Sequence, residues 1–410
     1  MPRKALTATA GQILELVRSG QVNTRRQIQE QTGLSRSTLG LRLAELISAG
    51  YLHESGSQAG AAGRPAGILS FADGDKYVLV ADLGATHARV ALQDAAGSTL
   101  ATSAEHLRIE DGPEPVLHEL RNRFRGLLSA AGRSPADLCG IGVGVPGPVD
   151  FATRRLQQPP IMPGWHDFPV AEVFEDAFGV PTLVDNDANL MGLGEARSQY
   201  PDVTSLLFVK VGTGIGAGLI LHGQPERGVA GAAGDIGHIR VAHPVDGLRC
   251  ACGATGCLAA HASGGALARQ LTERGIPATT SHDVVGLVQA GNAEAIAMVR
   301  TAGQLLGEVL ATAVAVLNPA VLVIGGAMAL THEYFLLGVR ETLYERTVPL
   351  ATRDLTVTSS VLQDRAAIEG ARIMVVDQEF SAEAVDSRLR LVTPDAAPSQ
   401  RRPSDRSSAG

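Results

Sequence analysis

Four side chains that commonly bind metal ions lie close together in the second half of the chain. His238 is followed by Cys250, Cys252 and Cys257, with two glycines between the last two cysteines. Three thiolates and one imidazole can complete a tetrahedral site, which Zn²⁺ prefers and which leaves no position open for catalysis. The sequence therefore predicts one structural zinc ion per chain. The alternative is that these cysteines are reduced thiols of a glycine-rich loop and that His238 is a buried core histidine.

Two glycine turns, each between two apolar runs, could bind phosphate. The first is DLGAT at 82–86 and the second is VGTG at 211–214. Backbone N–H groups in such turns can hold a phosphate group. The candidate residues are Asp82, Gly84, Ala85, Thr86, Gly212, Thr213 and Gly214. Because the strand–turn–strand pattern occurs twice, we expect a duplicated α/β unit whose halves face each other across a cleft.

Apolar runs that end in turns or acids indicate the elements that position these groups. Strands are expected at 76–84, 88–94 and 138–145, and a strand followed directly by a helix at 180–197. The segment 205–223 is expected to form a second hairpin, and 318–328 a further strand that ends in a glycine pair. These elements predict an α/β body.

The first 50 residues have a different pattern, which indicates three short helices. Thr24 and Gln27 have the spacing of a capping box, so a helix is expected to begin there and to end near Gly33. Ser35 can cap the next helix, whose leucines recur at helical spacing. Helix, glycine turn and helix together form a helix-turn-helix pattern.

Polar and basic residues of this region could contact DNA. Two extended runs around a Gly/Ala-rich loop follow the helices, as in the wing of a winged helix. Small polar side chains near a helix N-terminus can enter a major groove, and arginines can bind phosphates or base edges. The candidates are Arg25, Arg26, Arg36, Ser37, Thr38, Gly40, Leu41, Arg42 and, in the GRP sequence of the wing loop, Arg64. The alternatives are a structural helix bundle with solvated arginines and, for GRP, a flexible linker.

The charge distribution separates this head from the rest of the chain. Residues 1–70 contain eight Lys or Arg and four Asp or Glu, so they carry +4, and since the whole chain carries −7, the rest carries −11. A basic head on an acidic body suits a polyanionic partner. No uninterrupted apolar run reaches the roughly 18 residues that a membrane span requires, and no secretory signal is evident, so we expect a cytoplasmic protein with no membrane partner.

Three motifs in a fixed order resemble those of ROK family transcriptional regulators, of the type that includes xylose and N-acetylglucosamine repressors. They are DNDAN at 185–189, GDIGHI at 234–239 and CACGATGC at 250–257. The resemblance implies an N-terminal all-α winged helix on a two-lobed α/β body of the actin/hexokinase (ribonuclease H-like) fold. The expected divisions are a winged helix with its wing and linker at 1–70, lobe 1 at 71–188 with 360–378 packing back on it, lobe 2 with the zinc site at 189–359, and a disordered tail at 379–410.

The resemblance also implies a sugar or sugar-derivative site at Asn186, Asp187, Asp235 and His238. One ring nitrogen of His238 would bind zinc and the other would face the ligand. Carboxylates and amides at loop ends are suitable for binding a polyol, although DNDAN can also be explained as a helix cap. Asp235 and Ala259 stand where relatives usually have Glu, and Pro160 stands where many have Asn, so we expect an effector that differs from the glucose-like ligands of family kinases.

The same resemblance separates a regulator from a kinase. In ROK kinases the residue at Asp187 would be the general base, and the first glycine turn would approach ATP phosphates. Here Ala85 adds a Cβ to that turn, and His87 replaces a common lysine. We therefore expect no enzyme but a repressor of carbohydrate uptake or catabolism genes. The alternatives are an ATP-dependent sugar kinase with an added DNA-binding module, and a corepressor-type protein that binds a protein partner.

The expected partners follow from the regulator interpretation. They are a double-stranded DNA operator, a sugar effector and further copies of the chain, as a homodimer or a dimer of dimers on a pseudo-palindrome.

Overall fold

The computed structural model describes residues 8–58, 66–243, 247–331 and 333–392. The chain divides into two compact units. One unit combines residues 1–73 with 377–410, and the other comprises 74–376. The first unit therefore contains both ends of the chain.

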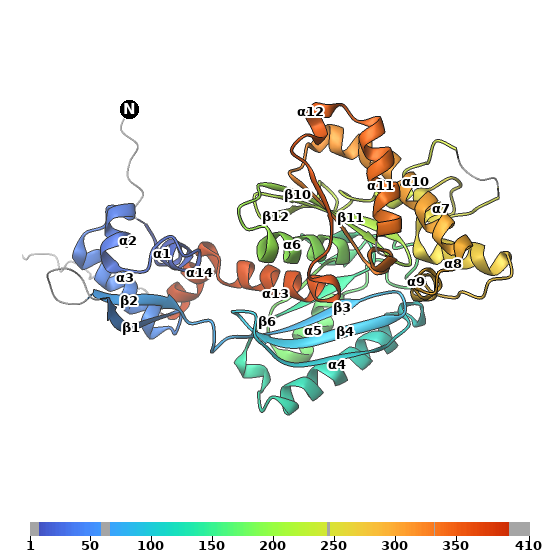
Figure 1. Cartoon of the computed structure of the whole chain (residues 1–410). Helices are drawn as coiled ribbons and strands as arrows, with labels where there is room; N and C mark the ends of the chain where they lie inside the picture. Colours follow the sequence, from blue (N-terminus) through green and yellow to red (C-terminus); the bar gives the residue numbers. More distant parts are fainter. Residues whose placement is uncertain (1–7, 59–65, 244–246, 332, 393–410) are drawn as a thin grey trace, which may run out of the picture. The chain divides into compact units, whose positions relative to one another are not determined.

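The first unit contains a winged helix. Its helices are α1 (Ala10–Arg18), α2 (Arg25–Thr32) and α3 (Arg36–Ser48), and its antiparallel wing strands are β1 (Leu52–Gln58) and β2 (Ala66–Phe71) (Figure 1). The capping box of Thr24 and Gln27 is confirmed, and Gly33 ends α2 with a φ of 71°. Ser35 accepts a hydrogen bond from Thr38 N and so caps α3. Leu39, Leu43 and Leu46 form the buried side of α3, as their spacing predicts.

The prediction of a disordered tail from residue 379 is wrong for its first part. Helix α14 (Ala382–Val392) packs on α1, where Gly11 N donates to Asp386 Oδ1 at 2.8 Å. A Cβ on Gly11 would lie 2.2 Å from the carbonyl oxygen of Ala382, so only glycine allows this approach. The Phe380 ring packs against Tyr51 and Phe71. The Pro/Ser-rich composition that suggested disorder belongs to 393–410, outside the described residues.

The second unit contains two five-stranded sheets with the same topology. The first has the order β5-β4-β3-β6-β9 and the second the order β12-β11-β10-β13-β14; in each, three antiparallel strands are followed by two parallel ones. The first sheet comprises β3 (Tyr77–Leu83), β4 (His87–Asp94), β5 (Thr99–His106), β6 (Leu138–Val145) and β9 (Thr182–Asn186). The second comprises β10 (Ser205–Val211), β11 (Ile215–Leu221), β12 (Gln224–Glu226), β13 (Val321–Gly325) and β14 (Thr356–Ser359). The predicted duplication is therefore present.

Each sheet has its own hydrophobic core. One core lies within residues 77–184 and includes α4 (Pro113–Ala130) and α5 (Val170–Phe178). The other lies within 207–357 and is built on α7 (Leu258–Ala262), α8 (Gly264–Glu273), α9 (Ser281–Gln289), α10 (Ala293–Leu317) and α11 (Glu333–Arg346). The remaining elements of this unit are α6 (Asp187–Gln199), α12 (Pro349–Thr352), α13 (Ala366–Glu379), the short strands β7 (Val149–Asp150) and β8 (Arg155–Leu156), and short 3-10 turns that include η3 (Ile236–His238).

Helix α13 packs closely on α6 through glycines. A Cβ on Gly194 would lie 2.2 Å from the carbonyl oxygen of Ala366, and a Cβ on Gly370 would lie 1.8 Å from the carbonyl oxygen of Leu190. The division between the two units falls within α13, whose last residues, from Asp377, belong to the winged-helix unit.

Helix α10 is the only described helix that is long and apolar enough to cross a membrane. Half of its most apolar window is buried in the protein, and the helix packs on α11. A core helix of a globular body has these same properties.

Candidate ligand cleft, metal centre and DNA-binding surface

The four candidate metal ligands converge in space. Their donor atoms all lie within 4.8 Å of one another. Cys252 Sγ and Cys257 Sγ are 3.8 Å apart, and Cys250 Sγ is 3.5 Å from His238 Nδ1. With Zn–S near 2.3 Å and Zn–N near 2.0 Å, tetrahedral geometry requires edges of about 3.8 Å and about 3.5 Å. The cluster therefore has the dimensions of a tetrahedral metal site.

The thiols of this cluster differ: burial raises the pKa of Cys250, whereas a hydrogen bond from the backbone of Ala254 lowers the pKa of the exposed Cys252. Burial and the neighbouring thiols raise the pKa of Cys257 to about 12. A bound divalent cation would stabilise the thiolates directly. Gly253 and Gly256 adopt φ values of 89° and 79°, which supply the turns that bring the cysteines together.

The DNDAN motif lies at the N-terminus of α6. Asn186 is the N-cap: its Oδ1 accepts from Ala188 N at 2.9 Å, while its Nδ2 donates to the Gly147 carbonyl oxygen at 3.0 Å. The predicted cap is thus confirmed. Asp187 begins the helix and is 4% exposed. Its Oδ2 forms an ion pair with Lys210 Nζ.

The GDIGHI and DNDAN motifs both pack against strand β11. Ala217 N of β11 donates to the Gly234 carbonyl oxygen at 2.8 Å. A Cβ on Gly237 would lie 2.2 Å from the carbonyl oxygen of Ile215, also in β11. On the other side of this region, a Cβ on Gly218 would lie 2.3 Å from the Ala188 carbonyl oxygen of α6. Both motifs are therefore anchored on residues 215–218 of β11.

His238 connects the metal cluster to the second motif. Its Nδ1 faces Cys250, whereas its Nε2 lies 3.8 Å from Asp235 Oδ1. Asp235 is exposed to solvent and available to a ligand. The two ring nitrogens thus face different sites, as the two roles expected of this histidine require.

A buried ion pair that the sequence did not reveal joins the loop before GDIGHI to DNDAN. Arg227 donates to Asp185 Oδ2 from Nε at 2.8 Å, and its guanidinium carbon lies 3.7 Å from the centre of the Phe151 ring. Asp185 is 1% exposed, and its Oδ1 accepts from Asn186 N and from Asn189 Nδ2. Because Asp185 is held in place by these bonds, the candidate sugar-binding residue next to it, Asn186, is held in place as well. The sequence offered no spacing rule for a pair separated by 42 residues.

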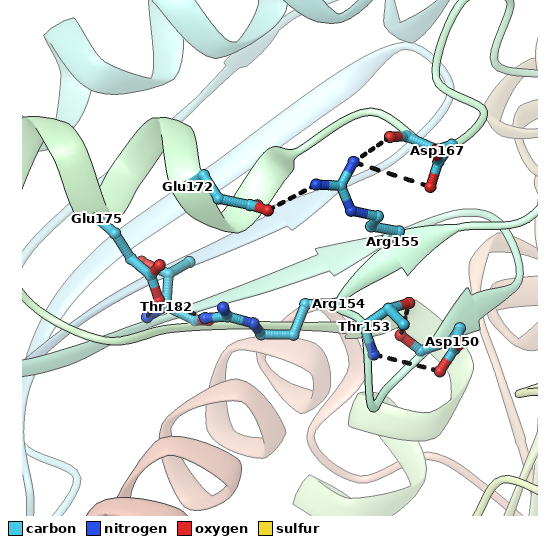
Figure 2. A network of polar contacts seen from close by, with 8 residues as sticks. All are labelled: Asp150, Thr153, Arg154, Arg155, Asp167, Glu172, Glu175 and Thr182. Atoms are coloured by element: carbon cyan, nitrogen blue, oxygen red, sulfur yellow. Dashed lines mark hydrogen bonds and ion pairs between the residues drawn. The ribbon is translucent and has the colours of Figure 1, made fainter.

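The β7–β8 hairpin, which carries Phe151, is held by its own polar network (Figure 2). Arg154 pairs with Glu175 and donates to the Thr182 carbonyl oxygen, whereas Arg155 donates to Glu172 at 2.8 Å and to the Asp167 carbonyl oxygen. Figure 2 shows the two arginines reaching in different directions from the hairpin. The hairpin is therefore a rigid support for the Arg227 side chain that stacks on it.

The first glycine turn carries a buried acid and a histidine ring. Asp82 is 8% exposed, and its Oδ1 has no hydrogen-bond partner among the described residues. Burial raises the pKa of Asp82, an effect that Lys210 opposes. The His87 ring lies directly over Gly84, since a Cβ there would be 2.2 Å from its Cε1. Ala85 is half-buried and Thr86 is exposed.

The second glycine turn is more open. Gly212 is buried, and its carbonyl oxygen accepts from Gly264 N at 2.8 Å. Thr213 and Gly214 are exposed.

Most candidate DNA-contacting residues lie on the outer face of α2 and α3. Arg36, Ser37 and Leu41 are exposed, with Leu41 68% exposed, whereas Thr38 and Gly40 are half-buried. Three arginines are engaged by glutamates, in the pairs Arg25–Glu54 at 2.7 Å, Arg26–Glu30 at 2.7 Å and Arg42–Glu45 at 3.2 Å. Arg64 lies outside the described residues.

The profile of the ROK family matches residues 78–378, which includes both sheets and all three motifs. The chain belongs to the ROK family.

Within this family the chain is similar to regulators and to kinases. It is 26% identical to the xylose repressor of Caldicellulosiruptor bescii over 383 residues, which are 90% of this chain and 95% of that protein. It is 30% identical to a glucokinase of Halalkalibacterium halodurans over 326 residues, which are 75% of this chain and 98% of the kinase. The match to the repressor thus extends over more of the chain.

A solved ROK structure has the same fold over most of the chain. A ROK family transcriptional regulator, a homolog of the E. coli MLC protein, superposes with a TM-score of 0.78 at 24% identity and covers 93% of this chain and 98% of its own. The predicted α/β fold with an N-terminal winged helix is therefore confirmed. Because ROK bodies occur in repressors and in kinases, the function must be argued from the sites.

Proposed function

We propose that this ROK protein is a DNA-binding transcriptional repressor of carbohydrate uptake or catabolism genes, controlled by a sugar or sugar derivative in its cleft. The observation that carries the proposal is a winged helix in the same chain as the DNDAN and GDIGHI motifs. The similarity to a xylose repressor over 90% of the chain supports it. A cytoplasmic location would follow from this function.

The exposed face of α3 is suited to a major groove. Ser37 and Leu41 lie one helical turn apart on this face, and a leucine can contact a thymine methyl group where serine bonds to a base edge. We assign base or phosphate contacts on α3 to Arg36, Ser37, Thr38, Gly40, Leu41 and Arg42. Arg25 and Arg26 would bind phosphates, and Arg64 would enter the minor groove.

The ligand groups of the cleft suit the hydroxyls of a sugar. Asn186 offers one N–H, while Asp187 and Asp235 offer carboxylate oxygens. With Nδ1 of His238 on the metal, Nε2 would carry the hydrogen and donate to the sugar. Ala259 and Pro160 provide no polar side chain, so the effector must be one that needs fewer acceptors than a family kinase supplies to glucose.

We propose that the metal is one zinc ion bound by His238, Cys250, Cys252 and Cys257. The soft thiolate ligands and the tetrahedral edges fit zinc, and four protein ligands leave no position for a reacting water. Zinc would fix the His238 ring and hence the ligand-facing nitrogen.

We propose that the body is not an active kinase, although kinases are among its relatives. His87 lies over Gly84 where phosphate would approach, and Ala85 carries a Cβ in the same turn. Phosphoryl transfer depends on positioning of the phosphates, so a filled phosphate turn would abolish it even though Asp187 is retained.

We propose a homodimer, or a dimer of dimers, in which sugar binding changes the spacing of the winged helices. Helix α13 is packed on α6, the helix that starts at Asn186 and Asp187, and its last residues belong to the winged-helix unit. It is therefore one of the two chain connections, with that at Asp73–Gly74, through which the ligand site could act on the head. The sugar strengthens or weakens DNA binding according to the conformation that it prefers.

The experiment uses zinc-loaded full-length protein. Its operator is selected from random duplex DNA, and thermal-shift hits from a panel of sugars and sugar phosphates are retested for their effect on operator binding. We expect a pseudo-palindromic operator, salt-dependent binding and at least one sugar that changes the affinity. Selection of no DNA would refute the repressor, and sugar-dependent ATP turnover above that of an Asp187→Asn variant would establish the kinase alternative.

A further inference from the structure

A half-buried ammonium group, that of Lys210, lies beside the carboxylate of Asp187 at the N-terminus of α6. Lys210 is the next-to-last residue of β10, whose sequence is SLLFVKV. All other residues of this strand except the first, a serine, are apolar. Its side chain is 20% exposed, and its Nζ pairs with Asp187 Oδ2. A lysine buried in a sheet is rare unless its charge is compensated, so it requires an explanation.

The strands beside Lys210 leave room for its side chain. Its antiparallel neighbour on β11 is Gly216, and its parallel neighbour on β13 is Gly325. Gly216 has no side chain that could compete for the space next to the lysine stem, whereas the Phe208 ring lies over Gly325, where a Cβ would be 2.3 Å from its Cζ. A Cβ on Gly216 would lie 3.7 Å from Ala188 Cβ, so this face of the sheet is the one toward α6 and Asp187. The sheet therefore directs the ammonium toward the N-terminus of α6.

The charge of Lys210 is stabilised by more than one carboxylate. Burial alone would lower the pKa of Lys210, but Asp187, Asp82 and Asp364 outweigh it and raise this pKa. Asp82, whose Oδ1 lacks a hydrogen-bond partner among the described residues, is thus near a positive charge that belongs to the protein itself. Asp187, Asp82 and Asp364 thus act on Lys210 as one charge cluster.

This cluster lies beside the turns that could hold phosphates. The Cε atom of Lys210 is 4.0 Å from the position that a Cβ of Gly212 would take, in the second glycine turn. Asp82 ends the strand that leads into the first turn. A divalent cation that carried nucleotide phosphates into these turns would need the oxygens of these same acids.

We propose that Lys210 is a built-in cation of this site: it holds Asp187, an acid that a divalent cation–nucleotide would need, in an ion pair, and so excludes that ligand while the sugar groups remain available. The inference rests on the proposed non-kinase function and identifies a residue responsible for it. A divalent cation would have to displace an ammonium from Asp187 and would then be repelled by it. Asn186, Asp235 and the second oxygen of Asp187 are not used by the lysine, so a neutral sugar meets no such barrier.

Binding of Mn²⁺ alone tests this proposal in the zinc-loaded, full-length protein. The variant Lys210→Met keeps the length of the side chain and removes its charge, whereas Lys210→Arg keeps the charge and is the matched control. We expect Lys210→Met to bind Mn²⁺ at least about tenfold more tightly than the parent, with no gain for Lys210→Arg. The gain should disappear in Lys210→Met/Asp82→Asn. An affinity of Lys210→Met within about twofold of the parent would overturn the proposal.

A second measurement decides the question if Lys210→Met fails to fold. Lys210→Gln retains a polar end that can bond to Asp187 and is expected to show the same gain. The parent itself is also informative: tight Mn²⁺ binding that Asp187→Asn weakens about tenfold would show that the lysine excludes nothing. These results are independent of operator selection. If Lys210→Met gains Mn²⁺ affinity but the protein selects no DNA, the repressor proposal is refuted and the inference about Lys210 still holds.

Discussion

The loops proposed to bind metal and sugar, residues 227–239 and 250–257, differ from the proposed DNA-binding face of α2 and α3 in how their functional groups are prepared. In the loops, four metal ligands converge within 4.8 Å, and the glycines of GDIGHI pack directly on β11. On the DNA-binding face, three arginines are held by glutamates of the same unit. The first region is assembled before its ligand arrives, whereas the second must exchange protein carboxylates for phosphates.

The difference follows from the energetics of the two sites. Buried thiols and a buried carboxylate are tolerated only in fixed surroundings, because each unsatisfied group has a large desolvation cost. Exposed ion pairs contribute about 0–1 kcal/mol and are easily exchanged. Substitutions in the loops should therefore affect folding and sugar binding together, whereas those on α2 and α3 should affect DNA binding alone.

Loss of the metal should have the largest effect. Cys257 is 3% exposed, and Cys257→Ser should remove zinc and destabilise the body by about 3 kcal/mol or more. Sugar binding should be lost with it, since His238 is no longer fixed. Zinc content and thermal unfolding, with and without a chelator, measure these effects. Cys139→Ser is the control, because Cys139 lies in β6 outside the cluster; an equal loss of zinc in both variants would contradict the assignment.

Two glycines with nearly the same φ, one in each region, allow us to compare how tightly the regions are packed. Gly231, in the loop between Arg227 and the GDIGHI motif, has a φ of 73°, and Gly33, directly after α2, has a φ of 71°. A Cβ on Gly231 would lie 1.9 Å from the Val149 carbonyl oxygen, whereas nothing lies within 4 Å of one on Gly33. Gly33→Ala should cost about 1 kcal/mol for the backbone strain, and Gly231→Ala about 2–4 kcal/mol.

Denaturant unfolding and sugar affinity test this pair. Gly231→Ala should also weaken sugar binding, whereas Gly33→Ala should not. Equal costs for the two substitutions would show that the sugar loop is no more tightly packed than the turn of the head.

Arg36→Ala should reduce DNA affinity without changing stability. Arg36 is exposed on α3 and forms no ion pair among the described residues. Loss of one phosphate or base contact costs about 1–3 kcal/mol per site and lowers the salt slope by about 1 for each phosphate lost. Operator binding at several salt concentrations measures both quantities. Arg108→Ala, an exposed arginine of the body, is the control; an identical loss there would mean that net charge alone drives binding.

Local patterns predicted the elements of the chain, whereas long-range pairings had to come from the structure. Capping residues and leucine spacing were sufficient for α2 and α3, and the repeated glycine turns for the duplicated sheets. The four metal ligands lie within 20 residues, so their spacing was informative. The Lys210–Asp187 and Arg227–Asp185 pairs join distant segments that have no periodic relation, and α14 was hidden beside a low-complexity tail.

The smallest predicted effect has the opposite sign. Glu54→Gln removes the carboxylate that holds Arg25, so DNA affinity should rise by about twofold to fivefold, the range of an exposed ion pair. The arginine lowers the pKa of Glu54, chiefly through their hydrogen bond. The stabilisation from this pair is therefore present above the pKa of Glu54 in the unfolded chain and is lost as the pH falls through its lower folded value. Glu341→Gln, which breaks the exposed Arg300–Glu341 pair of the body, is the control. A fall in DNA affinity for Glu54→Gln would mean that the ion pair positions Arg25 for DNA, and that the DNA-binding face is assembled in advance like the metal loops.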